Sequence, residues 1–143
     1  MTQVIIADLD GTISFDHHRT HYLKQEPKDW NAYYLACDKD EPNKAVISVL
    51  QDAFDTDIYI FSGRSDIARD KTIMWLRNHN VPYDFLFMRE DGDFTPDYEL
   101  KYKWLRHTGI QDRVLFVLED RDQVVKMWRE HNITCFQVAP GEF

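Results

Sequence analysis

Five short apolar runs, separated by helical patterns, constrain the fold of this chain more than any other feature. Each run has four or five residues, and most are rich in β-branched and aromatic side chains, as buried strands are. The runs cover residues 4–7, 58–61, 85–88, 114–118 and 135–138. Strands that alternate with helices in this way predict βαβ units. The expected fold is therefore α/β, with a five-stranded parallel sheet covered by helices on both faces.

Four helices are predicted from apolar residues that recur at helical spacing between the runs. They begin near Pro42, Asp66, Asp97 and Asp122, and the third ends near Gly109. Pro42 suits a first helical position, and Asp66 suits an N-cap. Val49 and Met74 are among the residues that we expect to face the sheet.

The chain has the size of one domain, and one stretch near its start does not follow the alternation. Its 143 residues are enough for one continuous core and few for two. Residues 13–41 show no clear apolar period and mix histidines with aromatic residues. We expect this stretch to form a small cap insertion with one short helix around residues 29–36. The prediction is one three-layer Rossmann-like domain over residues 1–143, with the cap beside its site.

Composition and charge exclude several classes of protein. The sequence is 43% hydrophobic and 29% charged, and none of its stretches approaches the roughly 20 apolar residues of a membrane span. Strand-like sequence begins at Val4 and leaves no room for a signal peptide, so we expect a cytoplasmic protein with no membrane partner. Cys37 and Cys135 are too few for a disulfide framework and lack zinc-type spacing, which predicts buried thiols. A formal charge of −8 argues against a protein that coats nucleic acid, but it allows one that grips a single phosphate at a chain end.

Polar side chains follow three of the five predicted strands directly. They are Asp8 and Asp10 after the first strand, Ser62 and Arg64 after the second, and Glu119 and Asp120 after the fourth. The carboxyl ends of parallel strands share one edge of the sheet, and ligands bind there, where the strand order reverses. The sequence therefore predicts one site at this edge.

The turn Asp8-Leu9-Asp10-Gly11-Thr12 carries the strongest chemical signal. Two aspartates one residue apart can converge on a hard cation such as Mg²⁺, and one of them can attack phosphorus to form an aspartyl-phosphate. Taken alone, the same five residues also fit an Asx-type turn that closes a strand. The other polar turns at the same edge favour the chemical interpretation.

The sequence resembles the haloacid dehalogenase-like (HAD) superfamily of aspartate-nucleophile phosphatases. The four motifs of that superfamily correspond here to residues 8–12, Ser62, Lys101 and Glu119-Asp120. This resemblance implies a Rossmann-like HAD fold and a phosphatase that uses Mg²⁺.

Within the superfamily, the chain is most similar to the 3′-phosphatase domain of bacteriophage polynucleotide kinase/phosphatase. The similarity depends on Phe61-Ser62-Gly63-Arg64, on residues 119–129 and on residues 136–143. Two departures stand out. Glu119 occupies a position where the phage domain has aspartate, and the sequence contains no G-x-x-x-x-G-K-[ST] kinase loop.

The resemblance implies a role for each acidic motif residue. Asp8 is the expected nucleophile and a metal ligand. Asp10 is the expected proton donor to the leaving alkoxide and then the base for the attacking water, and its main chain is a further metal contact. Asp120 is the other carboxylate ligand of Mg²⁺. Glu119 belongs to the predicted metal site, although the departure from aspartate leaves its role open.

Other motif residues are expected to hold the substrate. The resemblance assigns Ser62 and Lys101 to the oxygens of the transferring phosphoryl group. Periodicity alone would also fit a solvated helix face for Lys101. Asp97 lies one turn before Lys101 and is expected to pair with it or to cap the helix. The remaining predicted substrate contacts are Thr12, Gly63, Arg64 and, in the cap, Arg19.

Aromatic residues of the cap admit two interpretations. Trp30, Tyr33 and Tyr34 either form the small core of the cap or provide a stacking platform for a terminal base. The core is the favoured interpretation for Trp30, and both stay open for the tyrosines.

The predicted function is that of a Mg²⁺-dependent phosphatase that removes 3′-phosphates from DNA or RNA ends, as the resemblance implies. Its partners are then phosphorylated nucleic acid ends or nucleotides, and a separate polynucleotide kinase or ligase is a candidate partner. The main alternative is a HAD-type nucleotidase or another small-molecule phosphatase. A non-enzymatic, receiver-like Mg²⁺-binding domain is a third interpretation, and the Asp10-Gly11-Thr12 and Ser62-Gly63-Arg64 stretches argue against it.

Overall fold

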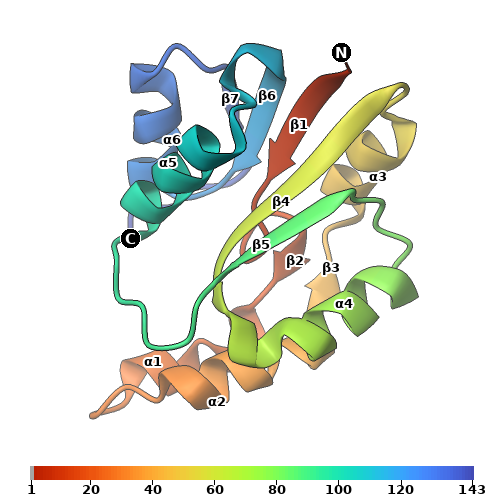
Figure 1. Ribbon diagram of the computed structural model, residues 1–143. Helices are drawn as coiled ribbons and strands as arrows, with labels where there is room; N and C mark the ends of the chain where they lie inside the picture. Colours follow the sequence, from red (N-terminus) through yellow and green to blue (C-terminus); the bar gives the residue numbers. More distant parts are fainter. Residues whose placement is uncertain (1) are drawn as a thin grey trace.

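The five predicted strands form one parallel sheet in the computed structural model, which describes residues 2–143 (Figure 1). The strands lie in the order β5-β4-β1-β6-β7, and each neighbouring pair runs parallel. Their bounds are β1 Gln3–Ala7, β4 Thr56–Ser65, β5 Phe85–Arg89, β6 Val114–Glu119 and β7 Cys135–Gln137. The predicted α/β fold with a five-stranded parallel sheet is confirmed.

Helices cover both faces of this sheet (Figure 1). They are α3 (Lys44–Asp52) and α4 (Arg69–Asn78) on one face, and α5 (Asp97–Thr108) and α6 (Asp122–Glu130) on the other. In β1, Ile5 and Ala7 belong to the core under α3 and α4, whereas Val4 and Ile6 belong to the core under α5 and α6. Because β1 is buried on both faces, its sequence is a continuous apolar run.

The segment between β1 and α3, called the cap here after its predicted role, lies next to the carboxyl ends of the strands (Figure 1). Two short strands, β2 (Ser14–Phe15) and β3 (Glu41–Pro42), pair antiparallel within it. Between them lie α1 (His21–Lys24), α2 (Trp30–Leu35) and the 3-10 helices His17–Arg19 and Cys37–Lys39. The helix expected around residues 29–36 is α2. The other three helices escape sequence analysis because three or four residues are too few to show an apolar period.

The prediction for the start of α3 is wrong. Pro42 pairs in β3, and Asn43 caps the helix by accepting a hydrogen bond from the backbone N–H of Val46 at 3.5 Å. Val49 is exposed, and Ile47 is buried. The two residues flank the apolar stripe of the helix on opposite sides, and packing against the sheet decides which of them is buried.

The segment before α4 also differs from the prediction. Ser65, not Asp66, caps a short 3-10 helix (Asp66–Ala68), and α4 starts after it. Met74 is exposed, whereas its neighbour Trp75 is buried.

The predictions for Gly109 and for the two cysteines are confirmed. Gly109 ends α5 with φ +66°, a left-handed conformation that glycine adopts without a steric penalty. Cys37 and Cys135 are buried free thiols. Within residues 2–143, no helix has both the length and the apolar character needed to cross a membrane.

Candidate active site

The polar turns predicted from the sequence come together at the carboxyl ends of β1, β4 and β6 (Figure 1). β1 is the central strand, with β4 on one side and β6 on the other, so the strand order reverses at this point. Parallel sheets bind ligands at such a reversal. The structure therefore brings the predicted polar turns together at the edge of the sheet where we expect the site.

Three carboxylates form the centre of the site. One oxygen each from Asp8, Glu119 and Asp120 lies within 4.8 Å of the others, and all three residues are buried. Thr12 Oγ1 lies 3.3 Å from Asp8 Oδ2 and 3.4 Å from Asp120 Oδ1. Thr12, predicted as a substrate contact, is fully buried and hydrogen-bonded to these two carboxylates. The structure thus brings together Asp8, Glu119 and Asp120, all three of which belong to the predicted metal site.

Lys101 is the cation of this centre. Its Nζ lies 2.8 Å from Asp8 Oδ1 and 2.8 Å from Glu119 Oε2, and the side chain is buried. Asp97, one turn earlier in α5, lies 3.4 Å away, so the predicted pair is present. Burial lowers the pKa of an ammonium group, but the surrounding carboxylates outweigh it and raise the pKa of Lys101 well above its usual value. Lys101 is therefore charged in the site, and the solvated helix face is excluded.

The centre carries more negative than positive charge. Burial, followed by the charge of Glu119, raises the pKa of Asp8 well above its usual value. The same two causes raise the pKa of Asp120 to about 7. Several clustered oxygen ligands with excess negative charge fit a hard divalent cation, so the residues present suit Mg²⁺. Asp8, Glu119 and Asp120 would hold it.

The carboxyl of Asp10 is not a member of this cluster. Its Oδ1 accepts a hydrogen bond from Arg64 Nη2 at 2.6 Å and another from Arg19 Nη2. Burial acts to raise the pKa of Asp10, but Arg64 and Arg19 outweigh it and lower the pKa well below its usual value. The side chain is therefore held apart from the metal centre, in keeping with a role other than ligation. The predicted main-chain contact of Asp10 with the metal stays a prediction.

Arg19 lies beneath Asp10 and not in the cavity. It is fully buried, and its Nε and Nη2 donate to the two carboxylate oxygens of Asp40 at 2.8 and 2.7 Å. The predicted direct contact of Arg19 with substrate therefore finds no support in this geometry, and the side chain instead orients Asp10. Asp40 is not among the predicted site residues, because its link to Arg19 exists only through the folded cap and has no local motif.

Residues 62–64, near the end of β4, differ in whether they line the cavity. Ser62 is fully buried, and its Oγ accepts a hydrogen bond from the backbone N–H of Arg64 at 3.1 Å. Gly63 and Arg64 line the cavity, and Ser62 does not. At Gly63, a Cβ would lie 2.3 Å from Asp97 Oδ1, so a side chain would not fit. The predicted phosphoryl contact of Ser62 stays a prediction.

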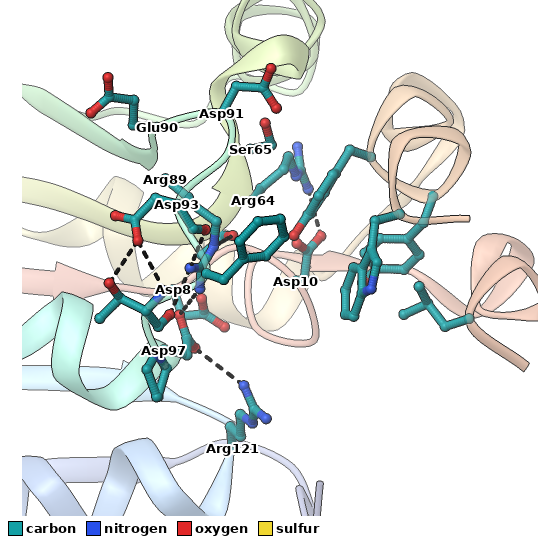
Figure 2. A pocket seen from close by; sticks show the side chains of 18 of the residues that line it. Asp8, Asp10, Arg64, Ser65, Arg89, Glu90, Asp91, Asp93, Asp97 and Arg121 are labelled. Atoms are coloured by element: carbon teal, nitrogen blue, oxygen red, sulfur yellow. Dashed lines mark hydrogen bonds and ion pairs between the residues drawn. The ribbon is translucent and has the colours of Figure 1, made fainter. Parts of the chain in front are cut away.

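A cavity of about 630 Å³ opens over these residues, between the sheet edge, the cap and the loop that joins β5 to α5. Figure 2 shows Asp10 facing Arg64 on one side of it and Asp97 facing Arg121 on another. Glu90 lies on the loop that follows β5 (Figure 2). Asp8 lies at the meeting point of these groups, where a phosphate that enters the cavity can reach it.

Comparison with known proteins gives the family. The family model described as the polynucleotide kinase PNKP phosphatase domain matches residues 2–143. The chain belongs to this family. It is also 32% identical, over 144 residues, to a protein of Autographa californica nuclear polyhedrosis virus that is assigned as a bifunctional polynucleotide kinase/RNA ligase. That alignment covers 96% of this chain and 19% of the viral protein.

Solved structures agree with the assignment to the PNKP phosphatase family. A chain of the Pnkp1/Rnl/Hen1 RNA repair complex is 35% identical, with a TM-score of 0.84 over 99% of this chain and 44% of that one. A second structure of this complex gives 35% identity and a TM-score of 0.86, over 100% of this chain and 47% of that one. A HAD-like hydrolase from Streptococcus pneumoniae shares the fold at 12% identity, with a TM-score of 0.64 over 95% of this chain and 84% of the hydrolase. The chain spans less than half the length of the viral and Pnkp1 relatives.

As a PNKP-type phosphatase domain, the chain is a phosphatase with the HAD fold. The turn over residues 8–12 contains Gly11, which has φ +82° and lies against Asp120. A Cβ at this position would lie 2.1 Å from Asp120 Oδ2. The sequence shows the glycine as part of a turn, but only the structure shows that it also makes room for a carboxylate.

Gly11→Ala is expected to displace Asp120 and to lower phosphatase activity about 100-fold, as misplacement by about 1 Å does elsewhere. The left-handed backbone should also cost about 1–2 kcal/mol of stability. Gly109→Ala is the matched control, because Gly109 has φ +66° and nothing within 4 Å of a Cβ. Phosphate release and urea unfolding measure the two effects. Equal activity of the two variants would refute the proposed role of the Gly11 contact.

Proposed function

We propose that this chain is a Mg²⁺-dependent polynucleotide 3′-phosphatase that forms an aspartyl-phosphate on Asp8. The observation that carries the proposal is the arrangement around the cavity. Asp8, with Lys101 and two further carboxylates, lies at its base, and Asp10, held by two arginines, faces the same space. Residues 13–41 act as the cap of the site. Membership of the PNKP phosphatase family supports the assignment.

Charge neutralisation is the first requirement of the reaction. A phosphomonoester dianion repels a carboxylate nucleophile, and Lys101 offsets part of this repulsion from within 2.8 Å of Asp8. Mg²⁺, when bound by Asp8, Glu119 and Asp120, supplies further positive charge and orients the phosphate. An oxygen of Asp8 then forms a bond to phosphorus, while the bond from phosphorus to the 3′ oxygen breaks.

Asp10 handles the protons of both steps. In the first step it gives a proton to the leaving 3′ oxygen, and in the second it takes one from the water that hydrolyses the aspartyl-phosphate. Arg64 and Arg19 favour the ionised form, which the second step needs. A phosphate in the cavity would repel the Asp10 carboxylate and compete for Arg64, which favours the protonated form for the first step.

Nucleic acid repair is the proposed context. The viral relative is assigned as a kinase/RNA ligase, and the Pnkp1 structures are of an RNA repair complex with Rnl and Hen1. The sequence of this chain contains no G-x-x-x-x-G-K-[ST] loop. We therefore propose that it works with kinase and ligase activities that other domains or other proteins supply.

The test is a comparison of phosphate release from matched substrates. An oligonucleotide with a 3′-phosphate should be hydrolysed with kcat/KM at least about tenfold above the same oligonucleotide with a 5′-phosphate, and above free nucleotides. EDTA should abolish release, and added Mg²⁺ should restore it. Preference for free 5′-mononucleotides would overturn the polynucleotide assignment and leave the phosphatase chemistry intact.

A nucleotidase or other small-molecule phosphatase is the second candidate, and one observation favours it. Glu90, Asp91 and Asp93 line the cavity and place negative charge where a long polyanion would pass. The same substrate comparison separates the two candidates.

A further inference from the structure

Away from its carboxylate centre, each cation that lines the cavity among the described residues lies beside a carboxylate. Its cations are Arg64, Arg89 and Arg121. Arg64 is bound by Asp10, and Arg121 donates to the carbonyl of Phe143 at 2.7 Å. Arg89 donates to backbone carbonyls. Arg89 Nη2 and Arg121 Nη1 also lie 3.9 and 3.8 Å from oxygens of the Asp97 carboxylate. This part of the cavity therefore disfavours a second phosphate.

Exposed aromatic side chains line the same cavity. Trp30, on α2 of the cap, is 45% exposed, and Phe94, on the loop between β5 and α5, is 90% exposed. Tyr34 lies beside Trp30, with ring centroids 5.8 Å apart and planes tilted by 30°. Tyr33 is buried. The core interpretation therefore holds for Tyr33, and the one favoured for Trp30 is wrong.

The cap holds Trp30 against a rigid neighbour. The ring of Tyr33 meets Trp30 edge-on, with centroids 6.0 Å apart. Tyr33 is fixed in turn, because its hydroxyl donates to Asp16 Oδ2 at 2.5 Å and the Arg19 guanidinium lies 4.3 Å from its ring centroid. A ring supported in this way loses little freedom when a ligand stacks on it.

Phe94 is exposed but lies on a fixed loop. Arg89 Nη1 donates to the carbonyls on both sides of it, those of Asp93 at 3.0 Å and Thr95 at 2.7 Å. Thr95 also donates to the Asp93 carboxylate from its backbone and its hydroxyl. The loop therefore presents a large apolar ring to the cavity although the ring gains little from packing.

We propose that Trp30 and Phe94 bind the terminal nucleobase of the substrate by stacking, while its phosphate occupies the Asp8 centre. This inference rests on the proposed function and specifies how the substrate is recognised beyond its phosphate. A nucleobase is flat and uncharged, so it gains from aromatic faces and is not repelled by Glu90, Asp91 and Asp93. The cavity thus favours substrates in which a base lies next to the reacting phosphate. It disfavours substrates in which a second phosphate lies there.

The kinetic test uses Phe94→Ala and Trp30→Ala on two oligonucleotides with a 3′-phosphate. One ends in a normal nucleoside, and the other ends in an abasic sugar. Each variant should raise KM for the normal substrate about 5- to 100-fold and leave kcat nearly unchanged, because stacking contributes to binding alone. Hydrolysis of the abasic substrate should be the same for all variants. Trp30→Phe should retain most of the affinity, because it keeps an aromatic face.

Phe54→Ala is the matched control, because Phe54 is 92% exposed and does not line the cavity. It should leave both substrates unaffected. If Phe94→Ala and Trp30→Ala lower hydrolysis of both substrates equally, or change neither, the stacking site is refuted.

A binding measurement separates this inference from the proposed function. In the Asp8→Asn background, an oligonucleotide with 2-aminopurine before its 3′-phosphate should lose fluorescence on binding, because the base stacks. Removal of Phe94 or Trp30 should abolish the quenching. Quenching in Asp8→Asn, together with no release of 3′-phosphate by the unsubstituted protein, would support the base site and refute the 3′-phosphatase. Binding without loss of fluorescence would refute the base site and would leave the proposed 3′-phosphatase function standing.

Discussion

Replacing Asp8 with asparagine is expected to reduce phosphate release by at least about 10⁴-fold, as loss of a nucleophile does in other enzymes. The amide has nearly the same size but cannot attack phosphorus, so no aspartyl-phosphate forms. Lys101 keeps Glu119 and Asp97 as partners in the variant. Phosphate release from a 3′-phosphorylated oligonucleotide measures the effect.

The same substitution should not destabilise the metal-free protein. Burial and the charge of Glu119 raise the pKa of Asp8, which means that its ionised form is unfavourable in the folded state. The uncharged amide removes that cost, so the urea midpoint should stay equal or rise. Asp52→Asn is the control on an exposed carboxylate and should leave activity unchanged. Retained turnover in Asp8→Asn would exclude Asp8 as the nucleophile.

Replacing Lys101 with methionine is expected to have the largest effect on stability, about 3–5 kcal/mol, because buried carboxylates lose their counter-charge. Asp8 and Glu119 both lie 2.8 Å from its Nζ. Activity should fall about 10²- to 10³-fold as well, since a cation next to the phosphate is lost. Urea unfolding in EDTA and phosphate release measure the two effects.

Lys103→Met is the matched control, because Lys103 lies on the same helix and is exposed. It should leave stability and activity almost unchanged. If Lys101→Met is as stable as this control, the counter-charge argument fails.

The pH dependence of stability provides a second check on Lys101→Met. The pKa of Asp120 is raised to about 7 and that of Asp8 is raised, so the folded state binds more protons than the unfolded state between about pH 4 and 7. Stability of the metal-free protein should therefore fall as pH rises through this range. The fall should be steeper in Lys101→Met, because the carboxylates lack their cation.

Local patterns account for the elements that the sequence predicts well. The apolar run of β1 is buried on both faces, and α6 buries Val124, Val125, Met127 and Trp128 as its spacing indicates. The α3 face was predicted less well. Its sequence allows two neighbouring stripes, and packing against the sheet covers the one with Ile47.

The sequence by itself determined the α/β alternation, the edge of the sheet that carries the site, and Asp8 and Asp120 as its acids. The first two follow from short-range periodicity and from turns of a few residues, and the two acids follow from the resemblance to the HAD superfamily. Only the tertiary structure decided that Lys101 neutralises the centre, that Arg19 and Asp40 hold Asp10, and that Trp30 and Phe94 share one cavity. These contacts join segments far apart in the chain, and no local pattern records which distant side chains packing brings together.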